Sequence, residues 1–268
     1  MRKTKLTDGT EIYCILATEA GVLDHHVAGY FNHGISLSRG ATVFDVGANI
    51  GVFGVRTLQN IEEAQVYAFE PVPDIYKCLK ANADQIDGER FHTFPVGISD
   101  HAGTLSFTYY PHSPALSTSK PEQWNEEELR KAVDGSISHP PPHLWMTQLL
   151  PGFLRRWIAY WFAKRMRSDA QNVQANLITV SEVIEQHHID RIDLLKIDCE
   201  GAEVECLMGI KANHWSKIMQ VVVEVHDQNG ALAHTQARLK EMGLVYQVIE
   251  QEDALQETQL YNIFARRA

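Results

Sequence analysis

Residues 42–54 read T-V-F-D-V-G-A-N-I-G-V-F-G. The first five form a short, largely apolar run, rich in β-branched and aromatic side chains, which predicts a buried strand. Glycines follow at 47, 51 and 54, and residues 52–58 take up a helical pattern. A strand, a glycine turn and a helix in this order predict a nucleotide-type ligand site. Glycine lets the backbone approach a ligand, and the helix N-terminus offers unpaired N–H groups.

The glycine spacing narrows the class of ligand. A dinucleotide fingerprint needs Gly-x-Gly-x-x-Gly, but Asn49 stands where its second glycine would be, which disfavours a nicotinamide oxidoreductase. The pattern is instead Gly-x-x-x-Gly from Gly47 to Gly51, with Asp45 two residues before it. That pattern is typical of S-adenosylmethionine (SAM) methyltransferases, and a nearby carboxylate suits a cationic sulfonium. The alternatives are a turn of the same shape that binds another nucleotide, or no ligand.

Two further strand ends carry acids that fit a cofactor. Residues 65–69 predict a strand that ends in Glu70-Pro71, and a strand-end acid about 20 residues past the glycines hydrogen-bonds ribose hydroxyls. Residues 91–96 predict a third strand, whose end approaches the adenine and leads to Asp100. Asp100 is either an acceptor for the adenine amino group or a turn residue before Gly103. The predicted cofactor contacts are Asp45, Gly47, Ala48, Asn49, Gly51, Glu70, Pro71, Gly97, Asp100 and Asp198.

Four motifs carry a family resemblance: V-F-D-V-G-A-N-I-G at 43–51, A-F-E-P at 68–71, L-L-K-I-D-C-E-G-A-E at 194–203 and V-V-V-E-V-H-D at 221–227. In this order they resemble the FkbM family of SAM-dependent methyltransferases. The resemblance implies an α/β fold with a Rossmann-like seven-stranded class I methyltransferase sheet, SAM as cofactor, and a hydroxyl acceptor on a natural-product intermediate or a sugar.

A fifth segment, S-P-A-L-S-T-S-K-P at 113–121, resembles the O-methyltransferases of this family in polyketide and nonribosomal peptide assembly lines. This finer resemblance implies an acceptor carried on an acyl or peptidyl carrier protein. It also implies that Ser117 and Thr118 lie near that acceptor.

The reacting groups are expected at the ends of the fourth and fifth core strands, where Asp198, Glu200, Glu224 and His226 stand. An alcohol is a poor nucleophile until a base takes its proton, and histidine is the commonest such base near neutral pH. We therefore predict His226 as the base, oriented by Asp198 or Glu200.

Each of these assignments has an alternative. His226 could bond a loop backbone, and Glu200 and Glu203 could merely complement a helix dipole. Asp198, Glu224 and His226 could instead hold a divalent ion, although no metal is predicted. N- or C-methylation and a non-catalytic SAM-binding docking module also remain as hypotheses.

The alternation of strands and helices breaks at residues 111–175, which we interpret as a helical lid insertion. The core comprises 39–110 and 176–268, and residues 1–38 predict a hairpin and a helix that form a flap over the cofactor. Acids are absent between Asp134 and Asp169, whereas residues 144–166 are apolar with Arg155-Arg156 and Lys164-Arg165. Three interpretations compete: a lid with a solvated basic face, a docking surface for an acidic carrier protein and its phosphopantetheine, and an interfacial membrane helix.

The overall composition limits which other classes of protein the chain can belong to. A chain of 268 residues fits one α/β domain with an insertion, and 44% hydrophobic residues can form a core. A net charge of −10 argues against general nucleic-acid binding. The four cysteines form no C-x-x-C pair, and no signal peptide or membrane-spanning run is expected. We therefore expect a cytoplasmic protein, with membrane association disfavoured.

Overall fold

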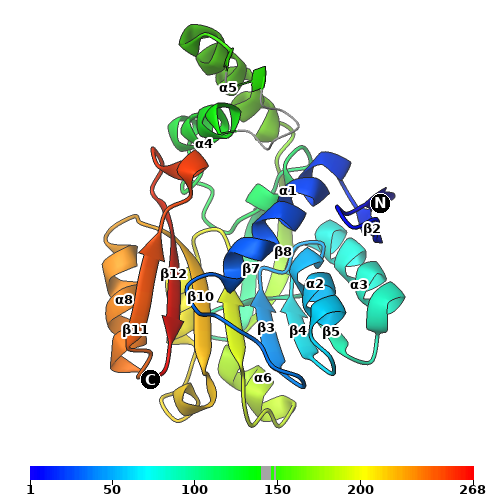
Figure 1. Cartoon of the computed structure of the whole chain (residues 1–268), viewed down its shortest axis with the longest axis vertical. Helices are drawn as coiled ribbons and strands as arrows, with labels where there is room; N and C mark the ends of the chain where they lie inside the picture. Colours follow the sequence, from blue (N-terminus) through cyan, green and yellow to red (C-terminus); the bar gives the residue numbers. More distant parts are fainter. Residues whose placement is uncertain (140–145, 148) are drawn as a thin grey trace.

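The structure is a computed structural model that describes residues 1–139, 146–147 and 149–268. A mixed sheet lies at its centre, helices cover both faces, and a helical pair stands beyond one end (Figure 1). The strands are β1 (Arg2–Lys5), β2 (Glu11–Cys14), β3 (Thr42–Val46), β4 (Gln65–Phe69), β5 (Phe91–Phe94), β6 (Val96–Ile98), β7 (Gly103–Tyr109), β8 (Gln171–Ile178), β9 (Leu194–Ile197), β10 (Gln220–His226), β11 (Tyr246–Glu250) and β12 (Leu260–Arg266). The α-helices are α1 (Ala17–Val27), α2 (Val52–Asn60), α3 (Pro73–Asp87), α4 (Glu126–Ser138), α5 (Gly152–Met166), α6 (Val180–Gln186), α7 (Glu203–Met208) and α8 (Ala231–Glu241). Short 3₁₀ helices include η1 (Ala28–Phe31), η2 (Pro114–Leu116), η4 (Trp215–Lys217) and η5 (Asp253–Leu255).

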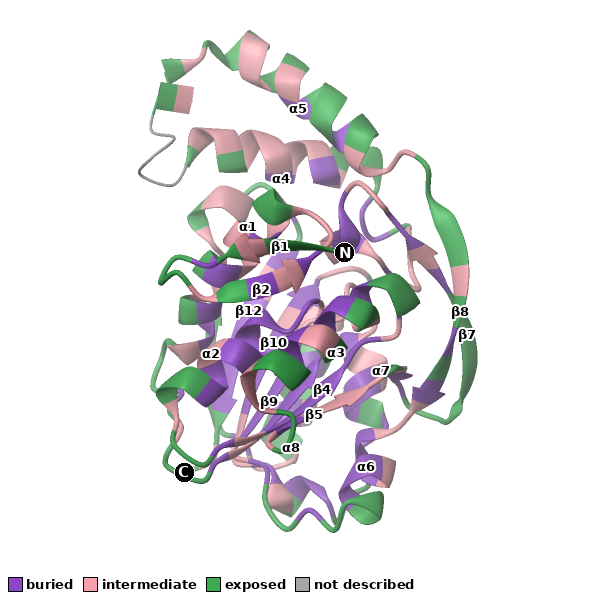
Figure 2. Ribbon diagram, turned by 90° about the vertical axis from the view of Figure 1, so that its right-hand side faces the viewer, coloured by how far each residue is buried: buried purple, intermediate pink, exposed green. Residues whose placement is uncertain are grey.

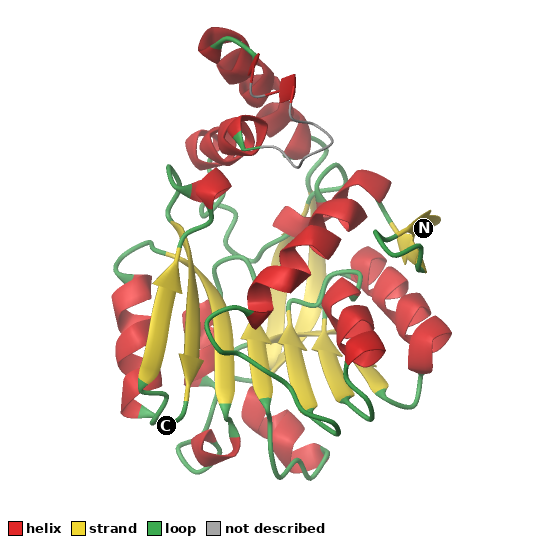
Figure 3. Cartoon of the chain, viewed as in Figure 1, coloured by secondary structure: helices red, strands yellow, loops and turns green. Residues whose placement is uncertain are grey.

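The main sheet has seven strands in the order β11-β12-β10-β9-β3-β4-β5. Neighbouring strands from β10 to β5 pair in parallel, whereas β12 is antiparallel to both β10 and β11 (Figure 3). The central strands are buried on both faces and therefore read as continuous apolar runs. The predicted seven-stranded methyltransferase sheet, with its closing antiparallel pair, is confirmed.

Each face of the sheet has its own hydrophobic core. Val43 and Phe44 are neighbours in β3 but belong to different cores, because successive side chains of a strand point to opposite faces. The first core packs α1, α2 and α3 on one face, and the second packs α6, α7 and α8 on the other (Figure 2). The continuous purple band in Figure 2 follows these central strands.

A second, three-stranded sheet in the order β6-β8-β7 stands beside the carboxyl end of β5. The prediction of one strand over 91–96 is wrong in detail, since Pro95 separates β5 of the main sheet from β6 of the second sheet. Proline lacks the N–H that would continue the ladder. β8 also begins at Gln171, five residues before the predicted resumption of the core at residue 176, because Val173, Ala175 and Leu177 alternate toward one face.

The insertion forms two helices, α4 and α5. Helix α4 begins after Asn125, whose side chain accepts from the backbone N–H groups of Glu127 and Glu128 at 3.0 Å. Its Gly135 lies so close to the β11–β12 connection that an added Cβ would come within 1.8 Å of the Ala254 carbonyl oxygen. The proline run 140–142 and Trp145 lie outside the described residues.

The N-terminal hairpin and the start of α6 are each held by a few specific side chains. β1 and β2 pair antiparallel around Asp8-Gly9, as predicted. Asp24 of α1 and Arg56 of α2 form a partly buried ion pair at 2.6 Å, which fastens this segment to the core. Helix α6 is capped by Thr179 with Glu182 in a capping box.

Candidate active site

The glycine turn passes directly over the end of β9. Gly47 has a φ of +74°, and an added Cβ there would lie 1.7 Å from the carbonyl oxygen of Asp198. The N–H groups of Gly47 and Ala48 both donate to the Phe69 carbonyl, at 3.1 and 3.0 Å, which fixes the turn to β4. Only glycine fits at position 47, because both its conformation and the contact exclude a side chain. The turn, β4 and β9 therefore meet at one edge of the sheet.

Glu70 is tied to that turn. Its carboxylate accepts from the Asn49 N–H at 3.1 Å and from the Val72 N–H at 2.8 Å. Asn49 itself has a φ of +51°, and its side-chain oxygen accepts from Ile50 N–H. Burial raises the pKa of Glu70 to about 7, although the two backbone hydrogen bonds oppose the shift. The two predicted cofactor residues Asn49 and Glu70 are thus in direct contact.

Lys196 connects the acids beneath the turn. Its ammonium lies 3.1 Å from Asp45 Oδ1, 3.4 Å from Asp198 Oδ2 and 3.2 Å from the Gly47 carbonyl oxygen. Burial alone would lower the pKa of Lys196, but Asp45 and Asp198 outweigh burial and raise it. Burial raises the pKa of Asp45, and neither of its carboxylate oxygens accepts a hydrogen bond of good geometry. Sequence reasoning missed Lys196, although a lysine inside the apolar run L-L-K-I was a signal.

A tyrosine from the N-terminal segment reaches the same place. The Tyr30 hydroxyl, carried by η1, donates to Asp198 Oδ2 at 2.9 Å. The Lys196 ammonium lies 5.3 Å from the centre of the Tyr30 ring, in cation–π contact. Burial, together with the charge of Asp198, raises the pKa of Tyr30 well above its ordinary value, so it stays a hydrogen-bond donor. The N-terminal segment thus contributes to the site a side chain that no sequence motif singled out.

His226 ends β10 inside a cluster of acids. Its Nε2 lies 3.4 Å from Glu200 Oε2, and its Nδ1 lies 4.0 Å from Glu203 Oε1. The Trp124 ring meets the imidazole edge-to-face, with the ring centres 5.1 Å apart. The residue is 5% exposed, and neither ring nitrogen makes a hydrogen bond of good geometry. Burial lowers the pKa of His226 to about 4, although Asp198 opposes that shift.

The loop between β9 and α7 holds Glu200 in an unusual backbone conformation. Glu200 has a φ of +55° and Gly201 a φ of +102°. Trp124 donates from its indole nitrogen to the Glu200 carboxylate, and the Thr118 hydroxyl donates to the Glu200 carbonyl oxygen. Burial and the charge of Asp198 raise the pKa of Glu200 well above its ordinary value. Backbone strain held by neighbouring groups is frequent at functional sites.

Two glutamates complete the cluster. Glu203 accepts from the Gly201 N–H at 2.6 Å, and burial raises its pKa to about 7. Glu224 lies on β10, two residues before His226, and burial followed by the charges of Asp198 and Glu200 raises its pKa well above the ordinary value. Among the described residues, no three His, Cys, Asp or Glu side chains are placed to hold a metal ion together.

Four further predicted site residues make the following contacts. Asp100 accepts from His101 and Ser99 and lies against Gly209, just after α7. Gly97 is packed among side chains, since an added Cβ would meet Leu177 at 2.7 Å. Ser117 accepts from the Tyr110 N–H at 3.3 Å, and Thr118 is fully buried against Glu200.

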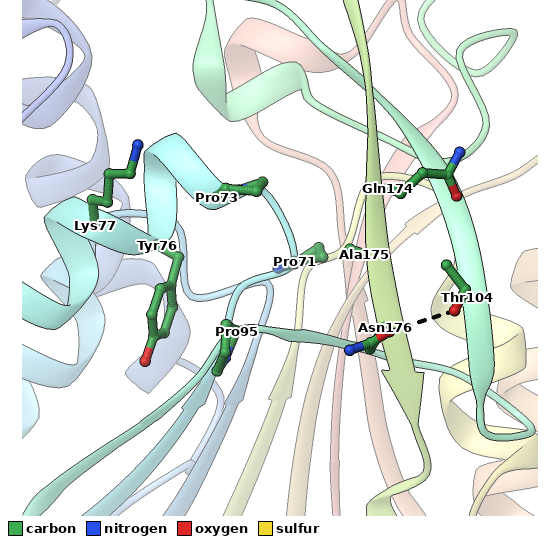
Figure 4. Close-up of a pocket in the computed structure, with 9 residues that line it drawn as sticks. All are labelled: Pro71, Pro73, Tyr76, Lys77, Pro95, Thr104, Gln174, Ala175 and Asn176. Atoms are coloured by element: carbon green, nitrogen blue, oxygen red, sulfur yellow. Dashed lines mark hydrogen bonds between the residues drawn. The ribbon is translucent and has the colours of Figure 1, made fainter.

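A pocket of about 320 Å³ opens beside Pro71, immediately after Glu70 in the chain (Figure 4). Three prolines and Tyr76 form its apolar side, and the β7–β8 arm closes the other side (Figure 4). Its lining residues are Pro71, Pro73, Tyr76, Lys77, Pro95, Thr104, Gln174, Ala175 and Asn176. Asp100 is absent from this lining, whereas Asn176 offers an amide to it.

The sheet order, the glycine turn and the strand-end acids define a SAM-dependent methyltransferase of the Rossmann-like class. The methyltransferase FkbM domain family matches residues 45–246, and the chain belongs to that family. The chain is 30% identical to 31-O-demethyl-FK506 methyltransferase FkbM of Streptomyces tacrolimicus, over 98% of this chain and 96% of that protein. It is 31% identical to methyltransferase sdnD of Sordaria araneosa, over 75% of this chain and 72% of that protein.

A third relative is much longer. The chain is 33% identical to the AMB antimetabolite synthetase AmbE of Pseudomonas aeruginosa, over 89% of this chain and 11% of that protein. Every helix in the described parts of the chain is too short or too polar to cross a membrane.

Proposed function

We propose that the protein transfers a methyl group from SAM to a hydroxyl of a natural-product intermediate. One observation carries the proposal: the buried, unbonded imidazole of His226 lies 3.4 Å from Glu200, at the strand edge that also bears Asp198 and the glycine turn. The relatives support the acceptor class, because one is named for a demethyl natural product and another for the synthesis of an antimetabolite.

The residues at the turn fit SAM. Gly47 lets the turn pass directly against the Asp198 carbonyl, and Asp45 and Glu70 are buried acids close to the turn. We expect the backbone of residues 47–49 and the Glu70 carboxylate to hold the cofactor, with the adenine in the pocket beside Pro71. SAM, when bound, supplies a methyl group already activated by a positive sulfonium. The negative charge of Asp198 favours a cation at this edge.

The chain's own residues then have to remove a proton and align the acceptor. The lowered pKa keeps His226 neutral at neutral pH, which is the form that accepts a proton. Glu200 stands close enough to orient the imidazole ring, and the charge of Asp198 favours the imidazolium that forms. Trp124 packs against the same ring and fixes its orientation. Alignment of the acceptor oxygen would supply several kcal/mol of the lowered barrier.

The acceptor has to enter through the lid. Gln123, Trp124 and Glu128 line a small cavity together with His226. Glu128 also accepts from the Gln259 N–H at 3.1 Å, so α4 is bonded to the segment before β12. We infer that α4 moves away from this segment when the acceptor binds. An acceptor attached to an acyl or peptidyl carrier protein would arrive by the same route.

A paired substitution tests the role of His226. In His226→Asn we expect the rate of methyl transfer to fall by ~10²–10⁴-fold, the usual contribution of a general base. His214→Asn is the matched control, because His214 is also buried, has a pKa lowered by burial, and lies after α7 near the opposite end of β10. Both variants should bind S-adenosylhomocysteine as the wild type does, measured by calorimetric titration with and without a chelator.

The acceptor is identified in the same experiment. Hydroxyl compounds are offered free and as thioesters on a carrier protein, beside a sugar acid, and the release of S-adenosylhomocysteine is followed. Turnover that persists in His226→Asn would place the base elsewhere. Failure of the wild type to bind S-adenosylhomocysteine would overturn the cofactor assignment.

A further inference from the structure

Helix α5 turns a row of aromatic side chains toward solvent. Phe153, Trp157 and Trp161 follow one another at intervals of four residues and therefore share a face. Their exposed fractions are 77%, 61% and 50%. Only Ala159 and Ala163 of this helix are buried. Ala163 belongs to the small core in which α5 packs against α4. The aromatic side chains of Phe153, Trp157 and Trp161 thus face away from the protein.

Positive charge accompanies this row. Arg156, Lys164 and Arg165 are exposed, and the Lys164 ammonium lies 5.6 Å from the centre of the Trp161 ring. Acids are absent from residues 135–168, although the whole chain carries a net charge of −10. The aromatic row therefore lies on the one long acid-free stretch of an acidic protein. An anionic surface would attract this segment and repel much of the remainder.

The position of α5 makes the row accessible. Figures 1 and 2 show α5 beyond α4 at one end of the molecule, with the sheet on the far side of α4. A flat surface could contact α5 without touching the central sheet. That end is also the one toward which the parallel strands of the main sheet point (Figure 3).

We propose that α5 is an interfacial helix that binds an anionic lipid surface. Tryptophan, tyrosine and phenylalanine beside arginine and lysine are typical of helices that lie in the headgroup region of a bilayer. A fluid bilayer adapts to a convex helix, whereas a protein partner requires a surface of complementary shape. A second copy pairing through its own α5 would oppose two basic faces. The proposal does not depend on the identity of the methyl acceptor.

Lipid binding would give the lid a second role. The bilayer would lie beside α4, the helix that covers His226. An amphiphilic hydroxyl compound dissolved in the membrane could then reach the active site without crossing bulk water. Among hydroxyl acceptors, the site would therefore favour those with a long apolar portion.

Vesicle binding tests the proposal. Purified wild-type protein is sedimented with vesicles of phosphatidylcholine alone or mixed with phosphatidylglycerol, at low and high salt. We expect binding only to the anionic vesicles, weakened by salt. Arg156→Gln/Arg165→Gln should weaken it roughly twentyfold, since each cation near the surface contributes about a fivefold factor. Arg39→Gln/Arg191→Gln, two exposed arginines far from the insertion, is the control and should bind like the wild type.

The aromatic row is tested by fluorescence. In a Trp145→Phe background, brominated lipids should quench the protein but leave its Trp157→Ser/Trp161→Ser variant largely unquenched, because the remaining Trp124 and Trp215 are buried. Tyr246→Ser removes an equally exposed aromatic side chain from β11 and should leave the quenching unchanged. Each variant is first shown to bind S-adenosylhomocysteine.

Three results would overturn the proposal. The first is an absence of binding to anionic vesicles at low salt. The second is binding that the α5 variants do not weaken. The third is a dimer or carrier-protein complex that protects Trp157 and Trp161 from aqueous quenchers while vesicles do not bind.

Discussion

At the scale of single residues, the site is a set of ionisable groups whose pKa values are moved by burial. His226 is held neutral, while Glu70 and Glu203 are raised to about 7. Lys196 is the cation among these acids, and its ion pair with Asp45 keeps it charged. The same cluster that would do chemistry therefore makes the stability of the fold depend on pH.

The pH dependence of stability should have opposite signs at His226 and Glu203. The folded pKa of His226, about 4, lies below its ordinary value of 6.5, so its contribution is complete above pH 6.5 and is lost as the pH falls toward 4. The loss amounts to about 3 kcal/mol. The folded pKa of Glu203, about 7, lies above its ordinary value of 4.5, so its contribution is complete below pH 4.5 and is lost as the pH rises through 7.

Urea denaturation between pH 4.5 and 7.5 measures both effects. Relative to the wild type, His226→Asn should gain stability as the pH falls, and Glu203→Gln should gain stability as the pH rises. Glutamine retains the oxygen that accepts from the Gly201 N–H. Parallel pH profiles for the three proteins would contradict the assignment of these shifts to burial.

At the scale of elements, close backbone contacts fix the lid and the turn. Gly135 lets α4 approach the Ala254 carbonyl, and Gly47 lets the cofactor turn approach the Asp198 carbonyl. The start of α4 depends on local sequence, since Asn125 stands directly before three glutamates. Its contact with η5 was not visible, because residues 135 and 254 are far apart along the chain.

Gly135→Ala should loosen the lid. The added methyl group would collide with the Ala254 carbonyl, an overpacking that costs about 1–3 kcal/mol. We expect faster hydrogen exchange in residues 120–138 and 251–260, with an unchanged rate in β3 and β4. Gly152→Ala is the matched control, since only a side-chain atom of Arg155, 4.0 Å away, lies near its added methyl group. Equal exchange in the two variants would show that the Gly135 contact does not hold the lid.

At the scale of the whole molecule, Lys196 joins parts that are distant in sequence. It contacts Asp45 on β3, the glycine turn and Asp198 after β9, and Tyr30 of the N-terminal segment closes over it. Removing one member of a buried ion pair leaves the other charge uncompensated. The stability of this edge of the sheet therefore depends on charged residues of the candidate active site.

A double-mutant cycle measures that coupling. Lys196→Met should lower the free energy of unfolding by about 3–5 kcal/mol, because Asp45 stays buried without a cation. Adding Asp45→Asn should restore part of the loss, since the carboxylate is then neutral. The measurement is urea denaturation of both single variants and the double variant at pH 7. Strictly additive losses would mean that the pair does not interact.

The sequence by itself determined the order of the core strands and helices, the glycine turn, and the strand-end residues Asp45, Glu70, Asp198 and His226. These features are local, because strand periodicity, glycine and a following acid all lie within a few residues of one another. The family motifs contained Lys196 and Glu203 without marking them as site residues.

Only the tertiary structure decided which side chains meet at the site. Tyr30 and Trp124 come from the N-terminal segment and the insertion, and no spacing rule places them beside Asp198 and Glu200. Asp100 is a candidate ligand residue by its position after β6, and its backbone lies beside Gly209, just after α7. Such contacts form only when segments that are far apart in the sequence pack against one another. The exposed face of α5 was also decided by the tertiary structure. This helix mixes apolar and basic residues, and only its packing against α4 determines which side faces solvent.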